Sequence, residues 1–404
     1  MCLCTSEHHG DLNSSASALL SFTGRKRGEL SIGVCALVNI TELSPPAQVR
    51  VCPSQEVRGR ALSIGVCALV NITELSPPAQ VRVCPSQEVR GRALSIGVCA
   101  LVNITELSPP AQVRVCPSQE VRGRALSKGV CALVNITELS PLAQVRVCPS
   151  QEVGGRALSI GVCALVNITE LSPPAQVRVC PSQEVGGRAL SIGVCALVNI
   201  TELSPPAQVR VCPSQEVGGR ALSIGVCALV NITELSPLAQ VRVCPSQEVR
   251  GQALSIGVCA LVNITELSPL AQVRVCPSQE VRGQALSIGV CALVNITELS
   301  PPAQVRVCPS QEVRGQALSI GVCALVNITE LSPPAQVRVC PSQEVRGQAL
   351  SIGVCALVNI TELSPLAQVR VCPLEDVRGQ ALSIGVRALL AFRGYHQEQV
   401  TLPL

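Results

Sequence analysis

The sequence predicts an all-β fold, a tandem-repeat solenoid resembling a parallel β-helix with one 32-residue repeat per coil. Three observations predict it. One segment recurs in tandem almost unchanged, apolar residues alternate with small or polar ones over its first half, and prolines interrupt this pattern at fixed points. Identical strands at a fixed period can stack on their own copies, so each coil obtains a core only from its neighbours.

The repeat fills residues 31–382 in eleven nearly identical copies. A partial twelfth copy and a divergent tail follow at 383–404, and residues 1–30 form a head without the repeat, which we expect to be disordered. Each copy is one supersecondary unit that has no core of its own. We therefore expect a single array rather than several domains, although the length alone would indicate two or three.

The first half of the repeat, Ser63–Leu75, reads SIGVCALVNITEL. As a strand it has one fully apolar face, made by Ile64, Val66, Ala68, Val70 and Ile72. As a helix it would be apolar all round, with Gly65 and several β-branched residues in its interior. The pattern favours a strand. An α-solenoid of helical hairpins stays open as the alternative, because known helical repeats have about 33 or 34 residues.

Prolines divide the rest of the repeat. Ser76-Pro77-Pro78 ends the first strand, because proline cannot donate to a ladder and restricts the residue before it. Ala79–Cys84 alternates again and predicts a second strand, which Pro85 ends. Ser86–Arg92 is polar and contains one glycine, which predicts a turn with at most a short strand at Val89.

Composition excludes several classes of protein. The chain is 47% hydrophobic and 14% charged, which is too apolar for ordinary disorder. Aromatic residues make up only 1%, so any core consists of Val, Ile, Leu, Ala and Cys. The net charge of +4 comes from arginines spread along the chain, without a basic cluster or aromatics to stack on bases. We therefore expect no nucleic-acid partner.

The longest uncharged apolar run, Ala61–Thr73, bears on membranes and on self-association. It is shorter than the roughly 20 residues that a membrane-spanning helix needs, so we expect no membrane segment. The head lacks the apolar core of a signal peptide, which makes the cytoplasm the default location. The run is also proline-free and rich in β-formers, which is typical of aggregating strands, so we expect self-association. Lys128, which replaces isoleucine in one copy, is interpreted as a gatekeeper charge against such pairing.

Residues with catalytic potential are scarce. The histidines are His8, His9 and His396, all outside the full repeats, and no histidine lies near a repeat cysteine such as Cys67 or Cys84. The cysteine spacing matches no zinc signature. We therefore predict that the chain is not an enzyme and has no catalytic, cofactor-binding or metal-ligating residues. Reduced thiols are the default state.

Every full copy contains the tripeptide Asn-Ile-Thr, a formal acceptor of N-linked glycans. One accidental acceptor copied eleven times counts as a single observation, so the motif is weak. The candidate sites are Asn39, Asn71, Asn103, Asn135, Asn167, Asn199, Asn231, Asn263, Asn295, Asn327 and Asn359.

The differences between copies indicate a young repeat. Neighbouring copies share variants: Gly154, Gly186 and Gly218 replace arginine in three consecutive copies, for example. Changes such as these need one base substitution each. The first hypothesis is therefore a translated minisatellite, a young tandem repeat with no identifiable biochemical activity. The alternatives are a structural or protein-interaction solenoid and an extracellular glycosylated repeat stalk.

Overall fold

The computed structural model describes residues 17–22 and 31–392 except for the Ser-Pro corner of each repeat. The corners left out are 44–46, 76–78, 108–110, 140–143, 172–174, 204–206, 236–238, 268–270, 300–302, 332–334 and 364–367. The chain divides into two compact units, which are described separately below. Unit 1 is Met1–Asn199 and unit 2 is Ile200–Leu404.

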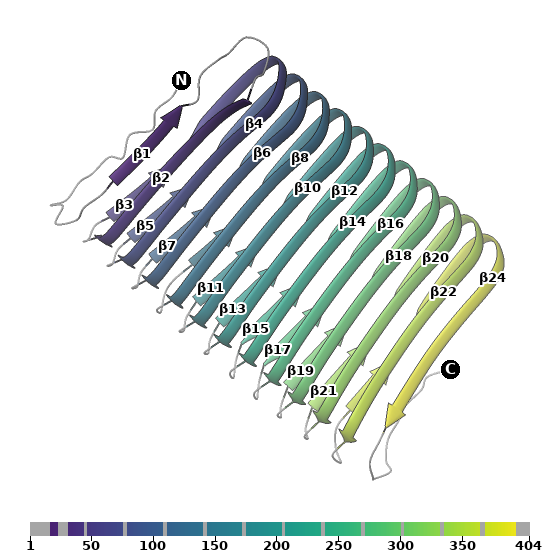
Figure 1. The fold of residues 1–404 in the computed structure, drawn as a ribbon. Coiled ribbons are helices and arrows are strands. Elements are labelled where there is room, and N and C mark those ends of the chain that lie inside the picture. Colours follow the sequence, from purple (N-terminus) through teal and green to yellow (C-terminus); the bar gives the residue numbers. More distant parts are fainter. Residues whose placement is uncertain are drawn as a thin grey trace. The chain divides into compact units, whose positions relative to one another are not determined.

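Each unit is a parallel β-solenoid, as the sequence predicts. A coil consists of one long curved strand and one short strand, and successive coils repeat this pair (Figure 1). The described residues contain no helix, so the α-solenoid alternative is wrong. It follows that no described helix has the length and apolarity to span a membrane.

In unit 1 the long strands form one sheet in the order β1-β2-β4-β6-β8-β10, and the short strands form another, β11-β9-β7-β5-β3. The boundary with unit 2 falls within β12 (Ser182–Leu203). The long strands are β1 (Ser17–Phe22), β2 (Ser31–Leu43), β4 (Ser54–Leu75), β6 (Ser86–Leu107), β8 (Ser118–Leu139) and β10 (Ser150–Leu171); the short strands are β3 (Ala47–Val51), β5 (Ala79–Val83), β7 (Ala111–Val115), β9 (Gln144–Val147) and β11 (Ala175–Val179).

Unit 2 repeats this arrangement, with orders β14-β16-β18-β20-β22-β24 and β23-β21-β19-β17-β15-β13. Its long strands are β14 (Ser214–Leu235), β16 (Ser246–Leu267), β18 (Ser278–Leu299), β20 (Ser310–Leu331), β22 (Ser342–Leu363) and β24 (Leu374–Phe392). Its short strands are β13 (Ala207–Val211), β15 (Gln240–Val243), β17 (Gln272–Val275), β19 (Ala303–Val307), β21 (Ala335–Val339) and β23 (Gln368–Val371).

The strands pair in exact register, each residue opposite the one 32 positions along the chain, such as Val66 opposite Val98. The predicted inward face is confirmed. The side chains of Val66 and Val70 are fully buried, and Ile72 and Ile96 are 3% and 2% exposed. Valines of the short strands pack from the other side. The core of each unit is thus a set of aliphatic columns, one rung per coil.

The polar turn predicted at Ser86–Arg92 is wrong, because this segment is the first part of the long strand β6. Pro85, Gln87 and Val89 are buried and continue the alternation of the short strand before them. In a solenoid the backbone partners come from the neighbouring coils, so a polar segment can stay extended. A glycine with positive φ lies within long strands such as β8, where it is Gly123. Figure 1 shows the long strands as arches.

That glycine adopts a conformation that other residues avoid. Gly123 has φ 146 and Gly155 has φ 142, within the region that favours glycine. A side chain at Gly155 would also collide with the carbonyl oxygen of Gly123 in the preceding coil. The glycine of Arg-Gly-Arg, Gly-Gly-Arg and Arg-Gly-Gln therefore has a structural role within the long strand, whereas its neighbours vary.

The end strands differ from the inner ones. Ser17–Phe22, within the head that the sequence left without structure, forms β1 and pairs antiparallel with Val34–Asn39 of β2. At the other end, β24 continues through Arg387 to Phe392 and pairs with β22. Among the described residues, no strand pairs with the outer edge of β24.

Lys128, which the sequence analysis interprets as a gatekeeper charge, is buried inside unit 1. It occupies the inward isoleucine column, between Ile96 and Ile160 of the adjacent coils. Its side chain is 2% exposed, and its Nζ has no hydrogen-bond partner. Burial lowers the pKa of Lys128 from 10.5 to about 8. A charge in this column opposes folding instead of protecting an edge.

We expect Lys128→Ile to stabilise unit 1. The depressed pKa corresponds to about 3 kcal/mol at pH 7, because one pKa unit is 1.36 kcal/mol. Below about pH 8 the lysine is protonated in both states and the penalty is complete. As the pH rises from about 8 towards 10.5, the folded lysine is neutral and the penalty shrinks. Urea denaturation of the reduced chain, followed by circular dichroism, should show the variant's advantage decreasing over this range.

A double variant provides the control. Lys128→Ile with Ser127→Lys moves the ammonium one residue along the strand, onto the exposed face. It should keep the gain in stability. An advantage that does not change between pH 7 and pH 10 would show that the ammonium is not buried.

Candidate functional site

The most regular polar feature of each unit is a ladder of asparagine side chains on the outward face of the long strands. In unit 1 the Nδ2 of Asn71 donates to the Oδ1 of Asn39 at 2.8 Å, and Asn103 donates to Asn71 at 2.9 Å. In unit 2 Asn263 donates to Asn231 at 2.9 Å. Each rung satisfies one amide donor and one acceptor. A hydrogen bond of this kind contributes about 0.5–1.5 kcal/mol to the free energy of unfolding.

These asparagines are the predicted glycan acceptors, so the ladder bears on that prediction. The Nδ2 atom that a glycan would occupy donates to the neighbouring coil at every rung described above. A glycan on a folded coil would have to replace that hydrogen bond. The use of these acceptors stays a prediction.

A second ladder of glutamines lies inside each unit. Gln119 donates from Nε2 to the Oε1 of Gln87 at 3.1 Å, and Gln151 donates to Gln119 at 2.7 Å. These side chains are 2–3% exposed. Burial of an amide is costly unless it is hydrogen-bonded, and stacking on an identical amide provides the partner. The sequence analysis missed this ladder, although the unbroken alternation from Val81 to Val89 places Gln87 inward.

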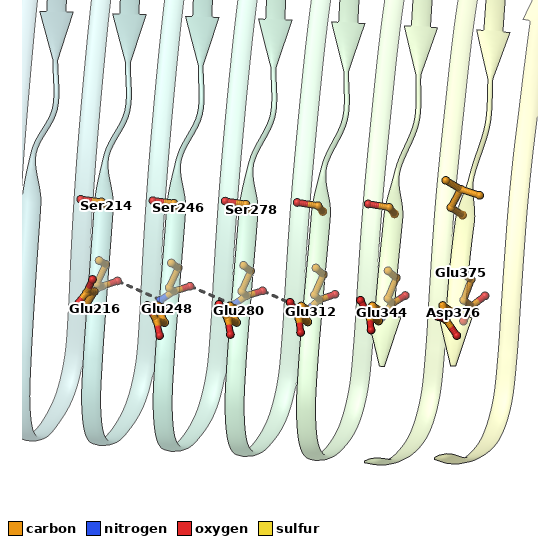
Figure 2. Close-up of a pocket in the computed structure, with 18 residues that line it drawn as sticks. Ser214, Glu216, Ser246, Glu248, Ser278, Glu280, Glu312, Glu344, Glu375 and Asp376 are labelled. Atoms are coloured by element: carbon orange, nitrogen blue, oxygen red, sulfur yellow. Dashed lines mark hydrogen bonds between the residues drawn. The ribbon is translucent and has the colours of Figure 1, made fainter. Parts of the chain in front are cut away.

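Unit 2 contains an elongated pocket of ≈ 700 Å³ beside its glutamine ladder. The Ser-Gln-Glu segment of five consecutive coils lines it, from Ser214–Glu216 to Ser342–Glu344, together with Leu374–Asp376 of the last coil. Figure 2 shows the same serine and glutamate side chains repeating from coil to coil. The lining offers hydroxyl, amide and carboxyl groups at a regular spacing.

The glutamine ladder is interrupted at the C-terminal end of this pocket. Gln343 is 3% exposed, yet neither its Oε1 nor its Nε2 has a partner, and the Oε1 of Gln311 is also unpaired. The next rung is Glu375, which pairs in register with Gln343. Burial raises the pKa of Glu375. A carboxylate has no hydrogen to donate, so it cannot extend an amide ladder.

The glutamates of the Ser-Gln-Glu segments also stack in register along each unit, and in many coils an arginine two residues later forms an ion pair with the glutamate. Arg90 contacts Glu88 at 2.6 Å, and Arg122 contacts Glu120 at 2.7 Å. Like charges directly opposite each other on neighbouring strands are destabilising, so the ion pairs relieve the column. Glu152 lacks this partner, because Gly154 stands where Arg122 stands in the preceding coil.

Cysteines form two further columns. Cys67 and its equivalents are exposed on the long strands, and Cys84 and its equivalents are half-buried just after the short strands. The alternation of the two strands puts both columns off the inward face. None of the cysteines in the described part of the chain forms a disulfide.

Comparison with known proteins gives no relative. No protein-family model, no curated protein and no solved structure matches the chain.

Gly154→Arg should stabilise unit 1 by supplying the missing partner of Glu152. There is open space around Gly154, so the side chain fits. A surface ion pair contributes about 0.2–1 kcal/mol, and replacing a strand glycine adds roughly 0.5–1 kcal/mol. Urea denaturation at low and high salt measures both effects. Gly154→Gln is the control, because it also replaces the strand glycine but adds no charge. If the two variants are equally stable at low salt, the ion pair contributes nothing.

Glu375→Gln restores the repeat's own residue and should continue the amide ladder into β24. The raised pKa of Glu375 means that folding disfavours its charged form. The penalty is complete above the raised folded pKa and disappears as the pH falls below 4.5, where both states become protonated. Amide hydrogen exchange in β24 should therefore slow in the variant at pH 7 and match the original near pH 4. Asp376→Asn, an exposed neighbour, should have little effect at either pH.

Proposed function

We propose that this chain acts as a structural repeat protein, a scaffold of stacked coils, rather than as a catalyst. The observation that supports this most is the exact register of the coils, in which each side chain lies on its own equivalent. Such a surface presents the same groups at intervals of about 4.8 Å, in rows of amides, hydroxyls and guanidiniums. Rows of this kind suit the binding of another repetitive surface or the filling of space with a stiff element.

Circular dichroism and denaturation of the purified chain test the scaffold directly. A β-sheet spectrum with a cooperative transition is expected, because a coil without its neighbours has no core. A coil-like spectrum would contradict the proposal and favour the second candidate, a translated young repeat without a biochemical role. The near-identity of the copies and their single-base variants support that candidate.

We further propose that the scaffold self-associates through the open edge of β24, with a second copy as the partner. The end coil lacks the cover that inner coils have. Val386 is 49% exposed, although its equivalent Val354 in β22 is 1% exposed. Leu374 and Leu389 are 65% and 61% exposed. Within the described residues, the backbone groups along this apolar edge also have no strand partner. Unpaired backbone groups of this kind recruit further strands.

The pairing of β1 with β2 indicates the geometry. There an antiparallel strand adds to the repeat at the segment Val34–Asn39. The equivalent segment of β24 is Val386–Ala391, so two copies can pair β24 with β24 antiparallel about a two-fold axis. This isologous contact closes after two copies.

Val386→Lys should convert a dimer into a monomer, because it places a charge on the edge that must be buried. Light scattering coupled to size exclusion, with reductant and chelator present, measures the mass. Ser255→Lys adds the same charge at an exposed position of the inner strand β16 and should leave the dimer intact. A native chain that is monomeric at high concentration, or equal loss in both variants, would contradict association through β24.

A further inference from the structure

The half-buried cysteines define a regular column, here called the corner column. It comprises the cysteine between Val and Pro in each coil, from Cys52 to Cys180 in unit 1 and from Cys212 to Cys372 in unit 2. The second set, called the sheet column, comprises the exposed cysteines of the long strands, such as Cys67 and Cys99. Neither column has a role in the scaffold described above.

The backbone holds the corner column in register. The amide of Cys84 donates to the carbonyl of Val51 at 2.9 Å, and Ser86 donates to Pro53 at 2.9 Å. The same pair of hydrogen bonds recurs in later coils of both units, for example from Cys244 and Ser246. Each corner thiol is therefore fixed on both sides relative to the thiol of the coil before it.

Neighbouring corner thiols interact with each other. Cys116 accepts hydrogen bonds from Cys148 and Cys84, which lower its pKa, and the guanidinium of Arg114 lowers it further. The same contacts raise the pKa of Cys84 and Cys148. In unit 2, Cys244 has a lowered pKa for the corresponding reasons, with Arg242 nearby. Thiols of adjacent coils in this column are thus close enough to form hydrogen bonds with one another.

An arginine column runs beside the corner column. Arg114 lies two residues before Cys116, on the same outward side of the short strand, and the pattern Val-Arg-Val-Cys recurs in every full copy. The sheet column has no such neighbour: the outward residues around Cys67 are Gly65, Leu69 and Asn71. Positive charge beside a thiol favours the thiolate, which is the form that binds metals.

The spacing between adjacent coils favours metal binding over disulfide formation in the corner column. Equivalent atoms of adjacent coils repeat at about 4.8 Å. A disulfide needs its two Cβ atoms at about 3.8 Å, so adjacent coils would have to move together by about 1 Å. Two thiolates that each bond an ion at about 2.3 Å, a typical metal–thiolate bond length, span up to about 4.6 Å, which is within about 0.2 Å of the repeat. The described residues contain no cluster of three or more Cys, His, Asp or Glu around one point. The column therefore matches ions that need two ligands.

We propose that the corner column binds soft monovalent cations, Cu(I) or Ag(I), each held between two thiolates of adjacent coils. Soft thiolate ligands prefer such ions. Two thiols release their protons to water and both sulfurs bond the ion, so 2 RSH and M⁺ give [RS–M–SR]⁻ and 2 H⁺, without a change of oxidation state. The product carries one negative charge, which the adjacent arginine column neutralises.

Anaerobic titration of the reduced full chain with Ag(I) or Cu(I), in competition with a coloured chelator, tests the proposal. Binding should saturate at one ion for every two corner cysteines. X-ray absorption at the metal edge should show two sulfur neighbours at about 2.3 Å. Zn²⁺, which prefers four ligands, should bind far more weakly. Equal affinity for Zn²⁺, or three or more sulfurs per ion, would overturn the proposal.

Two serine variants locate the site. Replacing every corner cysteine with serine should abolish tight binding, whereas the same change in the sheet column should preserve it. Circular dichroism checks that each variant folds. If the corner variant does not fold, replacing the arginine column with glutamine is the second test: affinity should fall several-fold while two-sulfur coordination remains. Loss of binding in the sheet variant alone, or no effect of the arginines, would contradict a corner site.

Discussion

In-register parallel pairing between identical coils is the constraint on which the rest of each unit depends. Within each unit, backbone hydrogen bonds join neighbouring coils, and the parallel strands described there pair at a period of 32 residues. Every atom therefore has its equivalent about one strand spacing away. The main neighbour of each residue is therefore the equivalent residue of the adjacent coil. Whether a residue type stabilises the fold at a given position depends on how well its side chain stacks on an identical side chain.

Residue types differ in how well they stack on an identical residue of the adjacent coil. Valine and isoleucine make dry columns, and asparagine and glutamine complete ladders because an amide both donates and accepts. Acids stack poorly, and the glutamates are relieved by arginines of their own coil. Lys128 has no such relief, because its column is inward and aliphatic. The effect of a substitution on stability therefore depends on the column in which it lies.

The repetition of identical coils also explains why the first and last coils differ from the inner ones. An inner coil is covered on both sides, whereas an end coil exposes the core residues that the next coil would cover, as Val386 does. At the other end β1 pairs with β2 in the opposite direction. Because the coils stack, the single cysteine at each corner becomes part of a row of thiols. The backbone pairing sets the spacing of this row, and the local sequence does not. Sequence spacing along the chain gives no indication of this proximity.

The sequence by itself determined the period, the strand that carries Ile64 to Ile72 inward, the second strand up to Cys84, and the outward position of both cysteines. These follow from alternation and proline placement, which are local properties of the backbone. It did not determine the extended conformation of Ser86–Arg92 or the hydrogen bonding of the buried Gln87. Polar residues beside a glycine are typical of a turn when read along one chain, and only neighbouring coils supply the hydrogen bonds that keep them extended and satisfy a buried amide. The tertiary structure decided these points because their partners lie 32 residues away.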